Sequence, residues 1–202
     1  MAPVINTERS IAVLCAFFLG LGVGAHALDE MMGNPLRTRV STRQLFTLGL
    51  LALSTAVAIG MYFAITLSLL LLPLILLELF FAIAYNLEIL EGRFHSSLVF
   101  SLSWGVVPFL TGYFVNALSL NIPVLLVSIA IGILTFVQRI LSTQARFLRR
   151  RAPTIQGMLL KDGTLIPTDS AELARPSEIA LKCLTLVVFL IAAALVLLRV
   201  AY

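Results

Sequence analysis

Two adjacent carboxylates stand at the end of the first apolar run of the sequence. The segment 26–30 reads HALDE, and helical spacing places His26 and Glu30 four residues apart on one face. Carboxylates at a membrane boundary are costly to bury without a cation or a basic partner, and carboxylate oxygens suit Mg²⁺. Asp29 and Glu30 are therefore a candidate magnesium site. The alternative is a solvated helix end whose acids pair with Arg37 or Arg39.

A second polar string closes the third apolar run. Tyr85, Asn86 and Glu88 can face the interior of a helical bundle, while Arg93 and His95 can hold an anion in the loop that follows. A tyrosine at this depth is also ordinary material of the aromatic belt at a membrane interface. The string predicts an anion site, whereas for Tyr85 alone the belt position is the favoured interpretation.

A basic string follows the fifth apolar run. Arg139 and Arg146 lie near the bilayer boundary, where they can point toward an anionic group held between helices. The run Arg149–Arg151 is instead typical of a segment that binds anionic lipid headgroups. Glu78 lies in the middle of the third apolar run, where a carboxylate has a high free-energy cost, so it is expected to be functional or paired.

Composition decides which elements must position these residues. Of 202 residues, 60% are hydrophobic and 12% charged, which is too little polar material to coat a soluble domain. The net charge of +4 is modest and reports membrane orientation rather than nucleic-acid binding. Gly20, Gly22 and Gly24 lack the strand and loop of a dinucleotide site and favour close helix packing. No catalytic serine signature, paired-cysteine zinc site or phosphate-binding glycine loop occurs in the sequence.

The apolar runs predict an all-α integral membrane protein with about six transmembrane helices in a single membrane domain, residues 1–202. The expected spans are residues 11–28, 45–65, 68–87, 98–117, 122–141 and 179–200. The segment 142–178 is expected to be a cytoplasmic loop. Within it, Lys161–Thr164 is typical of a hairpin turn and predicts a small β-hairpin.

The basic residues predict the orientation. With the N-terminus outside, all 14 lysines and arginines except Arg9 and Arg199 fall on the cytoplasmic side. We therefore expect both termini outside the cell membrane and the main loops in the cytoplasm. Almost all the candidate chemistry then lies at one membrane face.

The three strings together resemble the UbiA-type intramembrane prenyltransferase superfamily. The segment 26–30 followed by Asn34–Leu36 is similar to that family's Asn-Asp-x-x-Asp motif and its Arg-Pro-Leu-like turn. The resemblance continues at Ala84–Asn86 with Arg93 and at Gly105–Gly112, and it covers about residues 12 to 150. The chain departs from the family in having Ala27 at the first aspartate, about six spans instead of about nine, and no clear second aspartate-rich motif.

The resemblance implies Mg-dependent transfer of a prenyl group from a polyprenyl diphosphate to a membrane-accessible acceptor, either lipid-forming or aromatic. Asp29 and Glu30 would hold Mg²⁺, and Arg37, Arg93 and Arg146 would neutralise the departing diphosphate. The substrate-binding set would be completed by His26, Tyr85, Asn86 and Arg139. The alternative is a non-catalytic membrane protein of the same fold that acts as a lipid-binding or partner subunit. Six spans enclose limited volume, so a homo-oligomer is a further expectation.

Overall fold

The computed structural model describes residues 6–33, 38–152, 154–161 and 163–201. Over this range the chain is mostly helical and falls into two compact units, residues 1–135 and 136–202. We call them the first and the second unit and describe each by itself.

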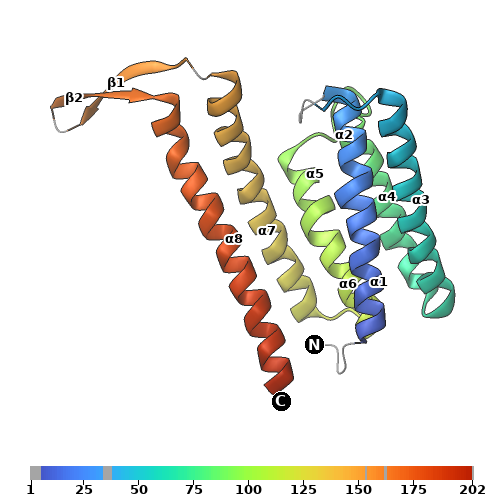
Figure 1. The fold of residues 1–202 in the computed structure, drawn as a ribbon. Coiled ribbons are helices and arrows are strands. Elements are labelled where there is room, and N and C mark those ends of the chain that lie inside the picture. Colours follow the sequence, from blue (N-terminus) through green and yellow to red (C-terminus); the bar gives the residue numbers. More distant parts are fainter. Residues whose placement is uncertain (1–5, 34–37, 153, 162, 202) are drawn as a thin grey trace. The chain divides into compact units, whose positions relative to one another are not determined.

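The first unit contains most of the helices (Figure 1). A continuous helical rod runs from Thr7 to Gly33, and helices α3 and α4 form an antiparallel pair joined by a short 3₁₀ turn. The elements are α1 (Thr7–Phe17), the π-helix η1 (Phe18–Ala25), α2 (His26–Gly33), α3 (Thr42–Thr66), the 3₁₀ turn η2 (Leu69–Leu71), α4 (Leu72–Asn86), α5 (Ser97–Ser101), the π-helix η3 (Leu102–Val106), α6 (Val107–Ala117) and the start of α7 (Ile122–Arg146).

Local sequence accounts for the helix ends in this unit. Ser41 and Gln44 form a reciprocal capping box that starts α3. Pro73 and Pro108 stand in the first turns of α4 and α6, where the missing N–H of proline is tolerated. The Asn121 side chain accepts a hydrogen bond from the N–H of Val124 at 3.1 Å and so caps α7.

The second unit contains the rest of α7, the π-helix η4 (Phe147–Arg151), a two-stranded hairpin and α8 (Ser170–Ala201). Strands β1 (Gln156–Lys161) and β2 (Thr164–Asp169) pair antiparallel, with Leu159 opposite Ile166. The hairpin predicted around Lys161–Thr164 is thus confirmed. Much of the segment expected to be a loop is helical, because α7 continues into η4 and the Asp169 carboxylate caps α8 by accepting from the N–H of Glu172 at 2.8 Å.

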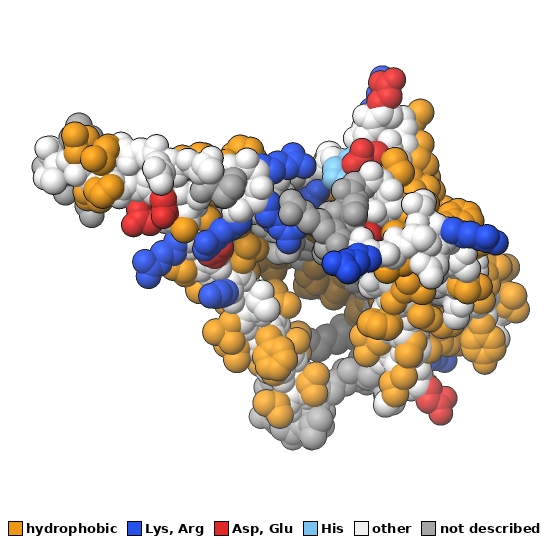
Figure 2. Space-filling view, turned by 45° about the horizontal axis from the view of Figure 1, so that its top comes forward, with side chains coloured by type: hydrophobic (Ala, Val, Ile, Leu, Met, Phe, Trp, Pro, Cys, Tyr) orange, Lys and Arg blue, Asp and Glu red, His pale blue; other side chains and the backbone are white. Residues whose placement is uncertain are grey.

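Within the described residues, six helical stretches are long and apolar enough to cross a membrane, which confirms the expected number. They are Thr7–Met32, Thr42–Thr66, Leu69–Asn86, Ser97–Ala117, Ile122–Arg151 and Ser170–Leu197. Hydrophobic side chains cover much of the visible surface (Figure 2), as expected for helices that face lipid. Ile65 and Phe189, for example, are 72% and 69% exposed. These properties indicate an integral membrane protein.

Glycines allow the helices of the first unit to approach closely. A Cβ atom added to Gly24 would lie 2.8 Å from Cγ of Leu53, so the packing role expected of this glycine is confirmed. A Cβ on Gly132 would lie 2.6 Å from Cγ2 of Val106. The Ser101 hydroxyl, which is buried, donates to the carbonyl oxygen of Gly132 at the same crossing. Backbone approach and one hydrogen bond therefore join α7 to α5 and η3.

This crossing leads to a prediction about paired glycine substitutions. Gly132→Ala should lower the free energy of unfolding by about 1–3 kcal/mol, because the new methyl group overpacks the contact with Val106. The control is Gly112→Ala, whose added Cβ would stay 3.7 Å from Val13, an ordinary contact distance. Unfolding of both variants in mixed micelles would measure the difference. Equal stability of the two variants would contradict the close packing at Gly132.

Candidate functional site

The first and second polar strings meet at one end of the first unit. Leu28 of α2 and Ala82 of α4 belong to one buried cluster with Leu53 of α3, and Met31 and Leu87 pack against it. This apolar cluster holds the end of α2 against the end of α4. Residues that are more than fifty positions apart in the sequence are thereby brought together.

A row of stacked rings connects the two strings. The His26 and Trp104 ring centroids lie 5.4 Å apart at an interplanar angle of 26°, and Trp104 stacks on Phe100 at 5.5 Å. Phe100 contacts Tyr85 at 5.7 Å, and Tyr85 stacks on His95 at 4.4 Å and 18°. We call these five residues the aromatic row. It joins α2, η3, α5, α4 and the loop that follows α4.

Two π-helical segments orient one end of the row. His26 is the first residue after η1, and Trp104 lies within η3. A π-helical turn shifts the phase of the side chains relative to an α-helix, and such turns are frequent at functional sites. The two shifts bring the His26 and Trp104 rings face to face.

Glu30 is buried and held by the chain that follows α2. It is 3% exposed, and its Oε1 atom accepts hydrogen bonds from the Thr38 N–H at 2.8 Å and from the Thr38 hydroxyl at 2.7 Å. Two donors on one oxygen compensate part of the cost of burying a carboxylate. Glu30 therefore ties residue 38 back to the end of α2, a structural task that is independent of any metal.

The acids offer only a small ligand set for magnesium. Asp29 is half-buried, and consecutive residues of an α-helix point about 100° apart, so Asp29 and Glu30 face different directions. Among the described residues, no three His, Cys, Asp or Glu side chains come together as a metal-binding group. Mg²⁺ is commonly held by one or two carboxylates, with water and substrate phosphates as its other ligands. The residues fit a magnesium site of this type. Asp29 would be the carboxylate ligand, because the carboxylate of Glu30 already accepts hydrogen bonds from Thr38.

Two members of the second string, Tyr85 and Asn86, lie inside the unit. Tyr85 and Asn86 are each 3% exposed, and the Asn86 amide donates to the carbonyl oxygen of Ala82 at 2.8 Å. His95 Nδ1 lies 3.2 Å from the carbonyl oxygen of Tyr85 and 3.8 Å from the Glu88 carboxylate. The ring contacts and these polar contacts fold the loop after α4 back onto its helix.

Backbone strain marks the same loop. Glu88, Leu90 and Glu91 have positive φ angles of 49°, 57° and 60°, and Gly92 has 77°. Left-handed residues other than glycine cost of the order of 1 kcal/mol each and cluster at functional sites. Arg93 follows this turn with an exposed side chain, where it is accessible to an anion.

The remaining candidate basic residues are not among the described residues of the first unit. Arg37 lies outside the described residues. Arg139 is half-buried and Arg146 exposed, both on the part of α7 that belongs to the second unit. Arg149, expected at lipid headgroups, forms a two-pronged ion pair with Glu178, with N···O distances of 2.7 Å and 2.9 Å. One member of the basic run thus fastens η4 to α8.

Sequence reasoning missed Phe100, Trp104 and Thr38. Phe100 and Trp104 are four residues apart, so they share a helix face, and Trp104 is the single tryptophan of the chain. That spacing could have identified the pair from the sequence. No such signal pointed to Thr38, because its hydrogen bonds to Glu30 depend on how the chain turns after α2.

Comparison with protein-family models, with curated proteins and with solved structures finds no match to this chain. The resemblance to UbiA-type prenyltransferases therefore rests on the three strings. The geometry adds that the first two strings are packed together and linked by the aromatic row.

The Glu30 contact gives a prediction about stability. Thr38→Val removes the hydroxyl donor but keeps the shape and the N–H, so it should lower the free energy of unfolding by about 1–2 kcal/mol. Thr38→Ser keeps the hydroxyl and should stay within about 0.5 kcal/mol of the parent protein. Unfolding in mixed micelles measures both, and identical values for the two variants would refute the role of the hydroxyl.

Proposed function

We propose that this chain is a UbiA-like membrane protein that binds a polyprenyl diphosphate and transfers its prenyl group to a lipid-forming or aromatic acceptor. The observation that carries the proposal is the aromatic row, which lies between the acidic end of α2 and the loop that bears Arg93. A prenyl diphosphate has an apolar chain, an anionic head and a carbon that becomes cationic on reaction. Apolar helices, basic side chains and aromatic faces complement these three parts.

In this proposal, Arg93 and Arg37 bind the diphosphate and the apolar helices take the prenyl chain. The bond between the allylic carbon and the diphosphate oxygen breaks, and the electron pair leaves with the diphosphate. Trp104 and Phe100 stabilise the allylic cation through their ring faces. The nucleophilic atom of the acceptor then forms the new bond and loses its proton. Tyr85, Asn86 and His26 shape the site around the reacting carbon.

Asp29 would hold magnesium, which would supply positive charge to the diphosphate. Arg139 and Arg146 belong to the second unit, and their part in binding an anion stays a prediction from the sequence. The proposed setting is the cytoplasmic face of the cell membrane, which follows from the distribution of basic residues. A homo-oligomer would enlarge the volume available to a long chain.

One observation favours a second candidate function. The hydrogen bonds from Thr38 give Glu30 a structural task, so the acids can be retained in a protein without catalytic activity. The alternative is therefore a lipid-binding or partner subunit of the same fold, which would bind a polyprenyl lipid and leave its diphosphate bond intact.

The single tryptophan provides a direct binding test. Farnesyl diphosphate with Mg²⁺ should change the intrinsic fluorescence of the detergent-purified protein saturably, because Trp104 stacks within the proposed site. Asp29→Asn should raise the apparent Kd at least about tenfold, which corresponds to ~1.4 kcal/mol. Trp104→Phe is the blank, and farnesol tests whether the diphosphate is needed. A signal that farnesol reproduces, or that Asp29→Asn leaves unchanged, would count against the proposal.

Catalysis is tested separately by release of pyrophosphate. With a panel of aromatic and lipid acceptors, the parent protein should release pyrophosphate and form the prenylated product, while Asp29→Asn should lose most of this activity. Thr38→Ser is the matched control, because it preserves the Glu30 contact and should remain active. Binding without pyrophosphate release across the panel would favour the non-catalytic alternative.

A further inference from the structure

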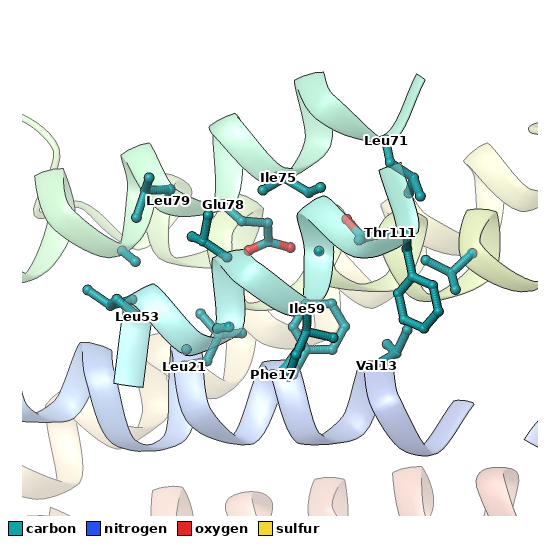
Figure 3. Close-up of a pocket in the computed structure, with 18 residues that line it drawn as sticks. Val13, Phe17, Leu21, Leu53, Ile59, Leu71, Ile75, Glu78, Leu79 and Thr111 are labelled. Atoms are coloured by element: carbon teal, nitrogen blue, oxygen red, sulfur yellow. The ribbon is translucent and has the colours of Figure 1, made fainter. Parts of the chain in front are cut away.

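A cavity of about 90 Å³ lies inside the first unit, and its wall is almost entirely apolar. Side chains from α1, η1, α3, α4 and α6 line it (Figure 3). The labelled apolar residues include Phe17, Leu53, Ile75 and Leu79. The carboxyl group of Glu78 projects among them from α4, within the third candidate span. The cavity therefore combines an apolar body with one acidic group.

Neither carboxyl oxygen of Glu78 has a hydrogen-bond partner among the described residues, although both atoms are buried. Thr111, the other polar side chain in the wall, donates its hydroxyl hydrogen to the carbonyl oxygen of Val107 at 2.9 Å. Its donor is thus already used. An acidic group within a membrane span is expensive to bury and is by default functional or paired. Within the described part of the chain, the partner expected for Glu78 is missing.

The shape and chemistry of the cavity restrict its occupant. Glu78 disfavours anions such as phosphates and carboxylates, so the cavity does not suit the head of a prenyl diphosphate. An apolar cavity of about 150 Å³ holds the six carbon atoms of benzene, so in the same proportion a cavity of about 90 Å³ holds about three or four heavy atoms, the size of propylamine. The oxygens of Glu78 accept hydrogen bonds, and an ammonium group supplies both donors and the complementary charge.

We propose that the Glu78 cavity is a binding site for an unbranched aliphatic primary amine, with the alkyl chain along the apolar wall and the ammonium group at the Glu78 carboxylate. This inference goes beyond the proposed prenyl transfer and does not depend on it. The site consists of residues different from Asp29, Glu30 and the aromatic row.

The pairing explains why a charge can be stable at this depth. Removing one partner of a buried ion pair leaves the other uncompensated, whereas two partners that bind each other share the cost of desolvation. An amine that enters from the lipid brings its own apolar chain, so the apolar wall contributes to affinity as well. Affinity should therefore require both the alkyl chain and the charged head.

The test uses the full chain in lipid nanodiscs with radiolabelled propylamine as the probe. Empty nanodiscs of the same lipid correct for partitioning. The parent protein should bind propylamine saturably, and Glu78→Gln should raise the Kd at least tenfold because it removes the charge with little change of shape. Glu8→Gln is the matched control, because it makes the same change at an exposed acid of α1 outside the cavity, and its Kd should stay within twofold of the parent value. Unlabelled propan-1-ol and propanoate should displace the probe at least tenfold less well than unlabelled propylamine.

Three results would overturn the proposal. They are the absence of saturable binding above empty nanodiscs, equal affinity in the parent protein and Glu78→Gln, and displacement by propan-1-ol as effective as by propylamine. Glu78→Asp guards against a folding defect, because it keeps the charge and should bind more tightly than Glu78→Gln. The response of Trp104 fluorescence to farnesyl diphosphate should be the same in Glu78→Gln as in the parent protein. That response reports separately on the proposed function.

Discussion

The hydrocarbon interior of a membrane supplies no hydrogen bonds, and the rest of the structure depends on this constraint. Each backbone N–H and C=O within a span must find a partner inside the protein, which selects helices. Apolar burial then adds little to the association of helices, because lipid chains are as apolar as leucine. Close approach at Gly24 and Gly132 and the hydrogen bond from Ser101 to Gly132 therefore carry a large share of the packing in the first unit.

The same constraint separates the two buried acids. Glu30 lies at the end of a candidate span and is satisfied by two donors from a single residue, Thr38. Glu78 lies in mid-span, where the neighbouring wall is apolar and Thr111 has already used its hydroxyl hydrogen. The difference is that the chain beyond the end of a helix can turn back and supply hydrogen-bond donors, whereas residues in the middle of a helix cannot.

The sequence predicted the number of spans and the hairpin, because length and apolar content identify a transmembrane helix and a glycine turn identifies a hairpin. It also selected His26, Tyr85 and His95, three members of the aromatic row. The four-residue spacing of Phe100 and Trp104 was not used, and the stacking of Trp104 on His26 depends on the phase shifts of two π-helices that no simple periodicity reveals. The last predicted span begins nine residues after the start of α8. This first part of the helix was not predicted because it contains Pro176, and proline is disfavoured inside a helix.

The hairpin and α8 are joined without a linker: β2 ends at Asp169 and the helix starts at Ser170. The capping hydrogen bond across this junction ties the end of β2 to the first turn of α8, and the ion pair between Arg149 and Glu178 ties η4 to the same helix. A helix of 32 residues extends about 48 Å. A change in the tilt of α8 in the bilayer would therefore move the hairpin together with the end of the helix.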